Sequence, residues 1–112
     1  MAFSESLASR TRDALARERG ISEKKMFGGL CFLLNGKLLV GVFKDSLLVR
    51  LGPDGAKSAL ARPHVREMDF SSRPMKGWVV VEPEGIDSDR LLKEWVNQAI
   101  EFVMILCTRL PG

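Results

Sequence analysis

The sequence predicts a two-layer α+β domain in which a mainly antiparallel, five-stranded sheet packs against helices. Three observations support this fold class. Strand-like residues with two tight-turn signals fill 24–51, a second strand signal lies at 78–82, and a long apolar helical stripe follows. The expected order of elements is α-β-β-β-α-β-β-α. With 112 residues the chain has the length of one domain, so we expect 1–112 to form a single unit.

Residues 4–19 are predicted to form the first helix. Ser4 is a suitable N-cap, because its hydroxyl can accept a hydrogen bond from an unpaired backbone N–H of the first turn. Gly20 suits the left-handed position that follows many helices. Residues that recur at helical spacing define the buried side of this helix: Leu7, Thr11, Ala14 and Leu15.

Three consecutive strands are expected at 30–35, 37–43 and 47–51. Asn35-Gly36 lies between the first two strands, and this dipeptide favours a tight hairpin because both turn positions need a positive φ. Asp45-Ser46 is expected to make the next reversal. The three strands should therefore form an antiparallel meander.

Both faces of this meander are apolar. Leu30, Phe32 and Leu34 alternate onto one face of the first strand. Cys31 and Leu33 alternate onto the other face. We expect one face to meet the helices, and the other to be partly covered or to form an interface.

The second half of the chain begins with a short helix at 52–61. Pro53 is well placed there, because a first helical turn does not need its missing N–H. A weak edge strand is expected at 64–69, followed by a loop. The strand at 78–82 is clearer, since it is rich in β-branched and aromatic residues.

The last helix is expected over 87–108, with Asp87 as its cap. Its apolar stripe is the broadest in the chain and should pack across the sheet, with Trp95 in the core. The stripe comprises Leu91, Leu92, Trp95, Val96, Ala99, Ile100, Phe102 and Val103. Further apolar residues at 104–110 leave a homodimer contact through this helix as an option.

Composition and charge are those of an ordinary globular protein. The net charge of +3 permits an anionic partner but falls short of the charge of a dedicated nucleic-acid binder. The N-terminal segment is too polar for a signal peptide, and no apolar run has the length of a membrane span. Cys31 and Cys107 lie far apart in apolar contexts, so we expect two free thiols in a reducing cytoplasm.

No combination of residues predicts catalysis, a metal or a cofactor. His64 is the only histidine, and one histidine with two scattered cysteines does not match the spacing of a metal site. Gly28-Gly29 precedes a strand and lacks the spacing of a phosphate-binding glycine motif, so we expect a bend there. These observations predict a protein that is not an enzyme, with no catalytic residues, no metal and no cofactors.

Four motifs together point to a known family. They are Met26-Phe27-Gly28-Gly29, Asn35-Gly36, Gly41-Val42 and Met75-Lys76-Gly77-Trp78, followed by Trp95 in a late helix. On these motifs, residues 5–103 resemble the TfoX N-terminal domain of the TfoX/Sxy family. The resemblance implies an α+β fold similar to secretion-chaperone-like domains, a bacterial cytoplasmic protein and no enzymatic activity.

Longer members of the TfoX/Sxy family regulate bacterial competence together with the cyclic-AMP receptor protein. We expect this chain to be a stand-alone N-terminal domain that lacks the C-terminal domain of those members. The resemblance implies a role in transcription regulation through protein binding, and it supplies no catalytic residues to transfer.

The candidate binding surface joins the two signature stretches. Lys24 and Lys25 lie at the entrance to the sheet, and Arg73 and Lys76 flank the second signature. If the two stretches converge, these cations form a basic rim to which an anionic or acidic partner could bind. Aromatic and methionine side chains would complete the surface. The whole predicted rim is Lys24, Lys25, Phe27, Arg73, Met75, Lys76 and Trp78.

Each half of this rim has an alternative explanation. Lysines at a sheet edge can simply discourage edge-to-edge aggregation. Trp78 can be a core residue that packs over Gly41 or against the last helix. The leading hypothesis is a protein-interaction module in transcription regulation. The alternative is a domain that binds nucleic acid directly through the basic rim. No membrane partner is expected.

Overall fold

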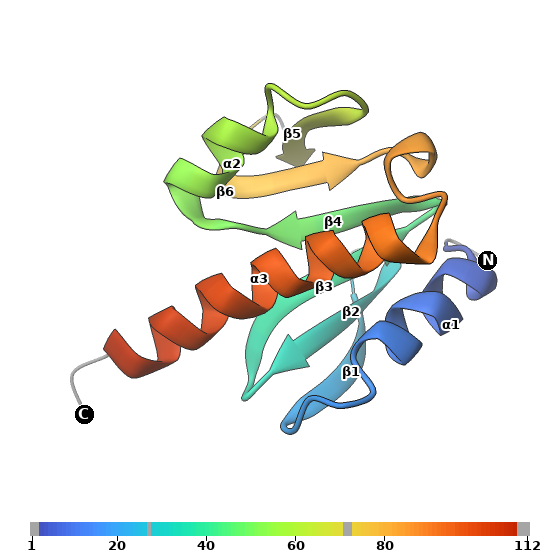
Figure 1. Ribbon diagram of the computed structural model, residues 1–112, viewed down its shortest axis with the longest axis vertical. Helices are drawn as coiled ribbons and strands as arrows, with labels where there is room; N and C mark the ends of the chain where they lie inside the picture. Colours follow the sequence, from blue (N-terminus) through green and yellow to red (C-terminus); the bar gives the residue numbers. More distant parts are fainter. Residues whose placement is uncertain (1–2, 27, 71–72, 110–112) are drawn as a thin grey trace.

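Helices and an antiparallel sheet form two layers in the computed structural model (Figure 1). The structure describes residues 3–26, 28–70 and 73–109. Its helices are α1 (Glu5–Ala14), α2 (Gly52–Ala59) and α3 (Asp89–Arg109), with a short 3-10 turn at Pro83–Gly85. This architecture confirms the predicted α+β class and, apart from one added strand, the predicted order of elements.

All neighbouring strands of the sheet pair antiparallel, in the order β1-β2-β3-β4-β6-β5. The last two strands form a hairpin whose second strand, β6, pairs with β4. The hairpin is thereby joined to the predicted meander. The strands are β1 (Ile21–Met26), β2 (Gly29–Leu34), β3 (Lys37–Phe43), β4 (Ser46–Arg50), β5 (Val65–Phe70) and β6 (Arg73–Val81).

The described residues thus form six strands, and the predicted number of five is wrong. The missed strand is β1, whose sequence has no apolar alternation. Its residues from Ser22 to Lys25 are exposed, and Ile21 is partly buried against the core. An edge strand of this kind is held by its hydrogen bonds to β2 and not by burial, so hydrophobic periodicity does not reveal it.

Strand β6 begins at Arg73, five residues before the predicted start at Trp78. Pro74 and Gly77 made this stretch look like a loop. Arg73 and Pro74 are extended because they pair with Phe70 and Asp69 of β5, whereas Gly77 has a left-handed φ of 89°. A register shift between Glu67 and Asp69 accommodates the irregular sequence. Pairing therefore overrides the local turn preference.

The first predicted turn is confirmed and the second is displaced by one residue. Asn35 has φ 52° and Gly36 has φ 81°, as a tight hairpin turn requires. In the next reversal Phe43 pairs with Ser46, so the turn residues are Lys44 and Asp45. Ser46 already belongs to β4, where it is buried.

Helix α1 begins as predicted, and Ser4 accepts a hydrogen bond from the backbone N–H of Leu7 at 3.1 Å. The helix ends at Ala14 and does not reach the predicted residue 19. After Leu15 the chain has left the core, since residues 16–20 are exposed. Gly20 therefore does not cap the helix directly.

The predicted cap of the last helix is wrong by one residue. Helix α3 begins at Asp89, and the hydroxyl of Ser88 accepts a hydrogen bond from the backbone N–H of Leu91 at 3.2 Å. Asp87 is exposed and lies before this cap. Both residue types make good N-caps, so composition alone did not separate them.

The main core lies between one face of the sheet and the helices. Figure 1 shows α3 crossing the sheet, and α3 contacts β3, β4 and α1. Leu30, Phe32 and Leu34 are buried in this core, as the alternation predicts. Trp95 is only 1% exposed, which confirms its predicted place in the core.

The opposite face of the sheet carries a second, smaller cluster. Leu48 and Val80 are its buried members, and Phe43 and Trp78 pack against them. A Cβ atom on Gly41 would lie 2.8 Å from the ring of Phe43. The large neighbour expected over Gly41 is therefore Phe43 and not Trp78.

Candidate partner-binding site

The strand order divides the predicted rim into two parts. Lys24 and Lys25 lie on β1 at one edge of the sheet, whereas Arg73 and Trp78 lie on β6. Strands β2, β3 and β4 separate them, so four inter-strand spacings of about 4.8 Å put roughly 19 Å of sheet between the two parts. The two lysines and the second signature are not neighbours in the sheet.

The remaining rim residues lie partly beyond what the structure describes. Phe27 lies outside the described residues. Arg73, Met75 and Lys76 have described backbones in β6 but no described side chains. Their part in a binding surface stays a prediction.

Lys24 and Lys25 do not form a joint basic patch, because successive strand residues point to opposite faces. Lys24 pairs with Cys31, whose side lies away from the helices, and Lys25 pairs with Leu30, whose side faces them. Both lysines are exposed. Charged residues at a sheet edge fit the role of preventing edge-to-edge association.

Trp78 contacts both apolar side chains and an arginine. Its side chain is half-buried and packs against Leu48 and Val80. It also lies beside Arg50, since the two residues are direct partners in the β4–β6 pairing. The guanidinium carbon of Arg50 lies 5.3 Å from the centroid of the Trp78 ring, which is within cation–π distance.

Arg50 is the functional candidate that the sequence did not reveal. Its guanidinium carbon also lies 5.8 Å from the ring centroid of Phe102 on α3, so aromatic rings from two elements flank it. Its Nη1 donates a hydrogen bond to the backbone carbonyl of Leu38 at 3.3 Å. Within the described ranges Arg50 forms no ion pair with a carboxylate.

These side chains line a shallow surface hollow where β4 leads into α2. The N–H of Leu51 donates to the carbonyl of Gly77 at 2.8 Å, and this bond ties the second signature to the start of α2. The ring of Phe102 lies so close to Gly52 that a Cβ there would be 2.4 Å from it. The lining residues are Arg50, Gly52, Pro53, Gly77, Trp78 and Phe102.

Three other arginines are paired with carboxylates and join elements of the fold. Arg12 on α1 makes two hydrogen bonds to Glu23 on β1, at 2.6 and 2.8 Å. The hydrogen bond from Arg12 lowers the pKa of Glu23, and the same bond raises the pKa of Arg12. Arg66 likewise pairs with Glu82. These pairs connect neighbouring elements and leave little free positive charge there.

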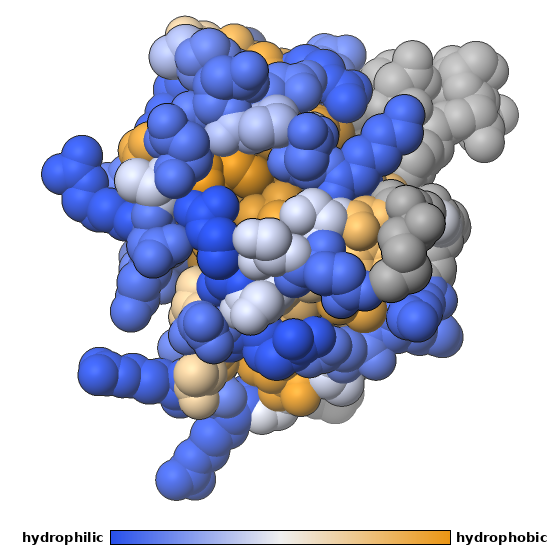
Figure 2. Space-filling model, turned by 90° about the vertical axis from the view of Figure 1, so that its right-hand side faces the viewer, coloured by the Kyte–Doolittle hydropathy of each residue, from blue (hydrophilic) through white to orange (hydrophobic). Residues whose placement is uncertain are grey.

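Arg10 makes the third pair, across the α1–α3 contact. It binds Asp89 at 3.0 Å and donates to the carbonyl of Ile86 at 2.7 Å. Hollows beside it are lined by residues from α1, the turn before α3 and α3 itself. Figure 2 shows the end of the molecule seen from the right of Figure 1, where hydrophilic residues surround scattered apolar ones. Among the described residues, the arginine–aromatic contacts involve Arg50 and Arg62 and not Arg10.

One cysteine thiol lies among the described side chains. Cys31 is fully buried, and burial raises its pKa, so the thiol resists ionisation. This confirms the predicted free thiol at Cys31. Among the residues that the structure describes, no three metal-ligating side chains gather into a group. Nor does any helix in that part of the chain have the length and apolar character to cross a membrane.

Fold and site together define a class: a small α+β domain with an open sheet and a shallow arginine–aromatic hollow at the β4–α2 junction. The chain belongs to the TfoX N-terminal domain family, which matches residues 13–103. This match confirms the resemblance drawn from the sequence motifs. No curated protein and no solved structure matches the chain. The likeness to secretion-chaperone-like domains therefore stays a prediction.

Proposed function

We propose that this chain is a protein-interaction module in transcription regulation, and that it binds its partner through the β4–β6 side of the sheet. The observation that carries the proposal is the Arg50 hollow, in which a half-buried arginine lies between Trp78 and Phe102. Arginine and tryptophan are the residue types that contribute most often to binding hot spots. Membership of the TfoX N-terminal domain family supports the regulatory context.

Direct binding of nucleic acid is less well supported by the geometry. A duplex binds through several phosphate contacts from clustered cations. Here Lys24 and Lys25 point to opposite faces of the sheet, and Arg12 is paired with Glu23. The two lysines of β1 are thus not clustered, and the described lining of the hollow includes one arginine.

Fluorescence anisotropy of the labelled chain tests the proposal. The chain is titrated separately with the cyclic-AMP receptor protein, with RNA polymerase and with duplex DNA, each at about 50 and 200 mM salt. We expect binding to one of the proteins that persists at the higher salt, and no binding to DNA alone. Binding to DNA that falls steeply with salt would instead establish the nucleic-acid alternative.

Matched variants locate the surface. Trp78→Ala should weaken binding of the protein partner, because truncation of a half-buried interface tryptophan removes a large contact area. Lys24→Gln is the control, since it changes an exposed rim residue on the far part of the sheet. Equal loss in both variants, or loss only in Lys24→Gln, would contradict the placement of the partner at the β4–β6 side.

A further inference from the structure

We propose that the Arg50 hollow binds a carboxylate side chain of an acidic partner segment, and that an apolar neighbour of this carboxylate rests against Phe102 and the outer end of α3. The inference rests on the proposed function, because it assigns the chemistry of the same partner. It goes further by naming the group that is recognised and the arginine that recognises it.

The first argument is the unused hydrogen-bonding capacity of Arg50. A guanidinium has five N–H donors in a planar fork that matches a carboxylate. Arg50 donates to the carbonyl of Leu38, and it makes no ion pair within the described part of the chain. By contrast, Arg10, Arg12 and Arg66 each bind a carboxylate. Arg50 therefore has donors available for an incoming carboxylate.

The second argument is preorganisation. The rings of Trp78 and Phe102 lie 5.3 and 5.8 Å from the guanidinium carbon and come from β6 and α3, two elements of the folded core. A guanidinium held between rings loses little conformational freedom when it binds, and its N–H edge can still reach a carboxylate. An unrestrained surface arginine lacks this advantage.

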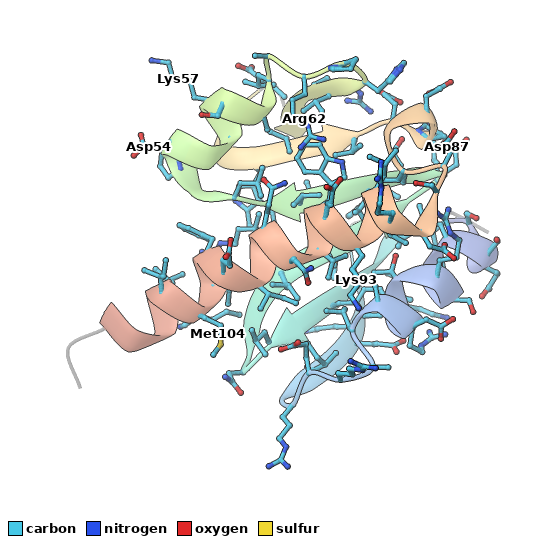
Figure 3. All side chains as sticks on the ribbon, viewed as in Figure 1. Asp54, Lys57, Arg62, Asp87, Lys93 and Met104 are labelled. Carbon is cyan, nitrogen blue, oxygen red and sulfur yellow. The ribbon has the colours of Figure 1, made fainter. Side chains whose placement is uncertain are left out.

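The third argument is the apolar surface that continues from the hollow along α3. Met104 and Ile105 are 46% and 52% exposed, the large apolar side chains most exposed in the described residues. Met104 lies two residues after Phe102 and points away from α2 (Figure 3), so of these two side chains only Ile105 can continue the surface of the hollow. Ile105 lies three residues after Phe102, so the two share one side of the helix. A partner segment that combines a carboxylate with apolar side chains matches this surface.

Charge argues for an acidic peptide over a polyanion. Among the described residues that line the hollow there is one arginine, whereas nucleic acid needs several cationic contacts. Asp54 is exposed in the first turn of α2, directly after the lining residue Pro53 (Figure 3). Its carboxylate would repel a run of phosphates more than the single carboxylate that one guanidinium fork can bind.

The test is an NMR titration that follows the Nε–Hε signal of Arg50 and the indole N–H signal of Trp78. The probe is an acetylated, amidated peptide of alternating leucine and glutamate, and the control peptide replaces each glutamate with glutamine. We expect the glutamate peptide to shift both signals and the glutamine peptide to bind roughly tenfold more weakly or not at all.

Protein variants separate recognition from simple charge. Arg50→Gln should lose about tenfold in affinity for the glutamate peptide, and Arg50→Lys should bind with intermediate affinity, because it keeps the charge but loses the fork. Arg62→Gln is the matched control, since Arg62 is also an arginine stacked on a ring, 4.3 Å from Trp95. Arg62 follows the C-terminal end of α2, whereas the hollow lies at the start of α2, so this variant should bind as the parent does.

Several outcomes would overturn the inference. These are equal binding of the two peptides, equal loss in Arg62→Gln, or no shift at peptide concentrations up to about 10 mM. A protein partner that is lost in Trp78→Ala but retained in Arg50→Gln would overturn the carboxylate site and leave the proposed function standing. Peptide binding at Arg50 without any protein partner in the anisotropy assay would contradict the proposed function and leave the carboxylate site standing.

Discussion

The contact between Phe102 and the start of α2 makes a quantitative prediction about Gly52→Ala. Gly52 has φ +82°, a left-handed conformation that costs an alanine about 1–2 kcal/mol. The new Cβ would also lie 2.4 Å from one ring carbon of Phe102 and 2.7 Å from another, so the ring must move. Overpacking of this kind typically costs about 1–3 kcal/mol. The two effects together should lower the free energy of unfolding by about 3 kcal/mol.

Gly36→Ala is the matched control for the backbone effect. Gly36 has φ +81°, almost the same as Gly52, but no atom lies within 4 Å of the position its Cβ would take. It should therefore cost only the roughly 1–2 kcal/mol of the left-handed conformation. The difference of about 2 kcal/mol between the two variants measures the displacement of the Phe102 ring.

Urea unfolding of the two variants, followed by circular dichroism and fluorescence, provides the assay. The same Gly52 substitution in a Phe102→Ala background completes a double-mutant cycle. We expect its cost there to fall to that of Gly36→Ala, because the ring is absent. Equal costs for the two glycine variants, or an unchanged Gly52→Ala cost without the ring, would refute the packing of α3 against the start of α2. The wall of the Arg50 hollow would then be misplaced.

Three further predictions concern other parts of the fold. Glu23→Gln should cost less than about 1 kcal/mol at neutral pH, because its ion pair is exposed. The pKa of Glu23 is lowered on folding, so the stabilisation from this ion pair is present above the unfolded pKa and is lost as the pH falls through the folded pKa. The free energies of unfolding of the parent and of Glu23→Gln, measured in urea, should therefore converge in acid. Ser88→Ala should cost about 1 kcal/mol in thermal unfolding and Asp87→Ala clearly less, since the Ser88 hydroxyl makes the cap. In a Cys107→Ser variant, the buried thiol of Cys31 should react with a thiol reagent only after unfolding.

Regular periodicity explains which parts of the fold the sequence could predict. The alternation of Leu30, Phe32 and Leu34 is a property of any half-buried strand, and it correctly assigned the two faces. The Asn35-Gly36 turn follows from the backbone conformation that its two residues tolerate. Trp95 was placed in the core by helical spacing alone.

Features that depend on pairing could not be predicted in this way. Strand β1 is polar, and it exists because its backbone completes hydrogen bonds with β2. Arg73 and Pro74 are extended because β5 lies beside them. Arg50 was missed for a related reason. Its surroundings come from β6 and α3, which lie far from it in the sequence, so no local pattern marks an arginine that two rings will flank.

The strand order also determines what a partner must be like if it uses the whole predicted rim. Lys24 and Trp78 are separated by three strands, about 19 Å of sheet, so neither a small ligand nor an extended peptide shorter than about six residues can contact both. A protein that covers a standard interface of about 800 Å² per partner can. Loss of affinity in Trp78→Ala alone therefore indicates a local contact at the Arg50 hollow. A smaller additional loss in Lys24→Gln, below that of Trp78→Ala, indicates a partner large enough to reach across the sheet to β1.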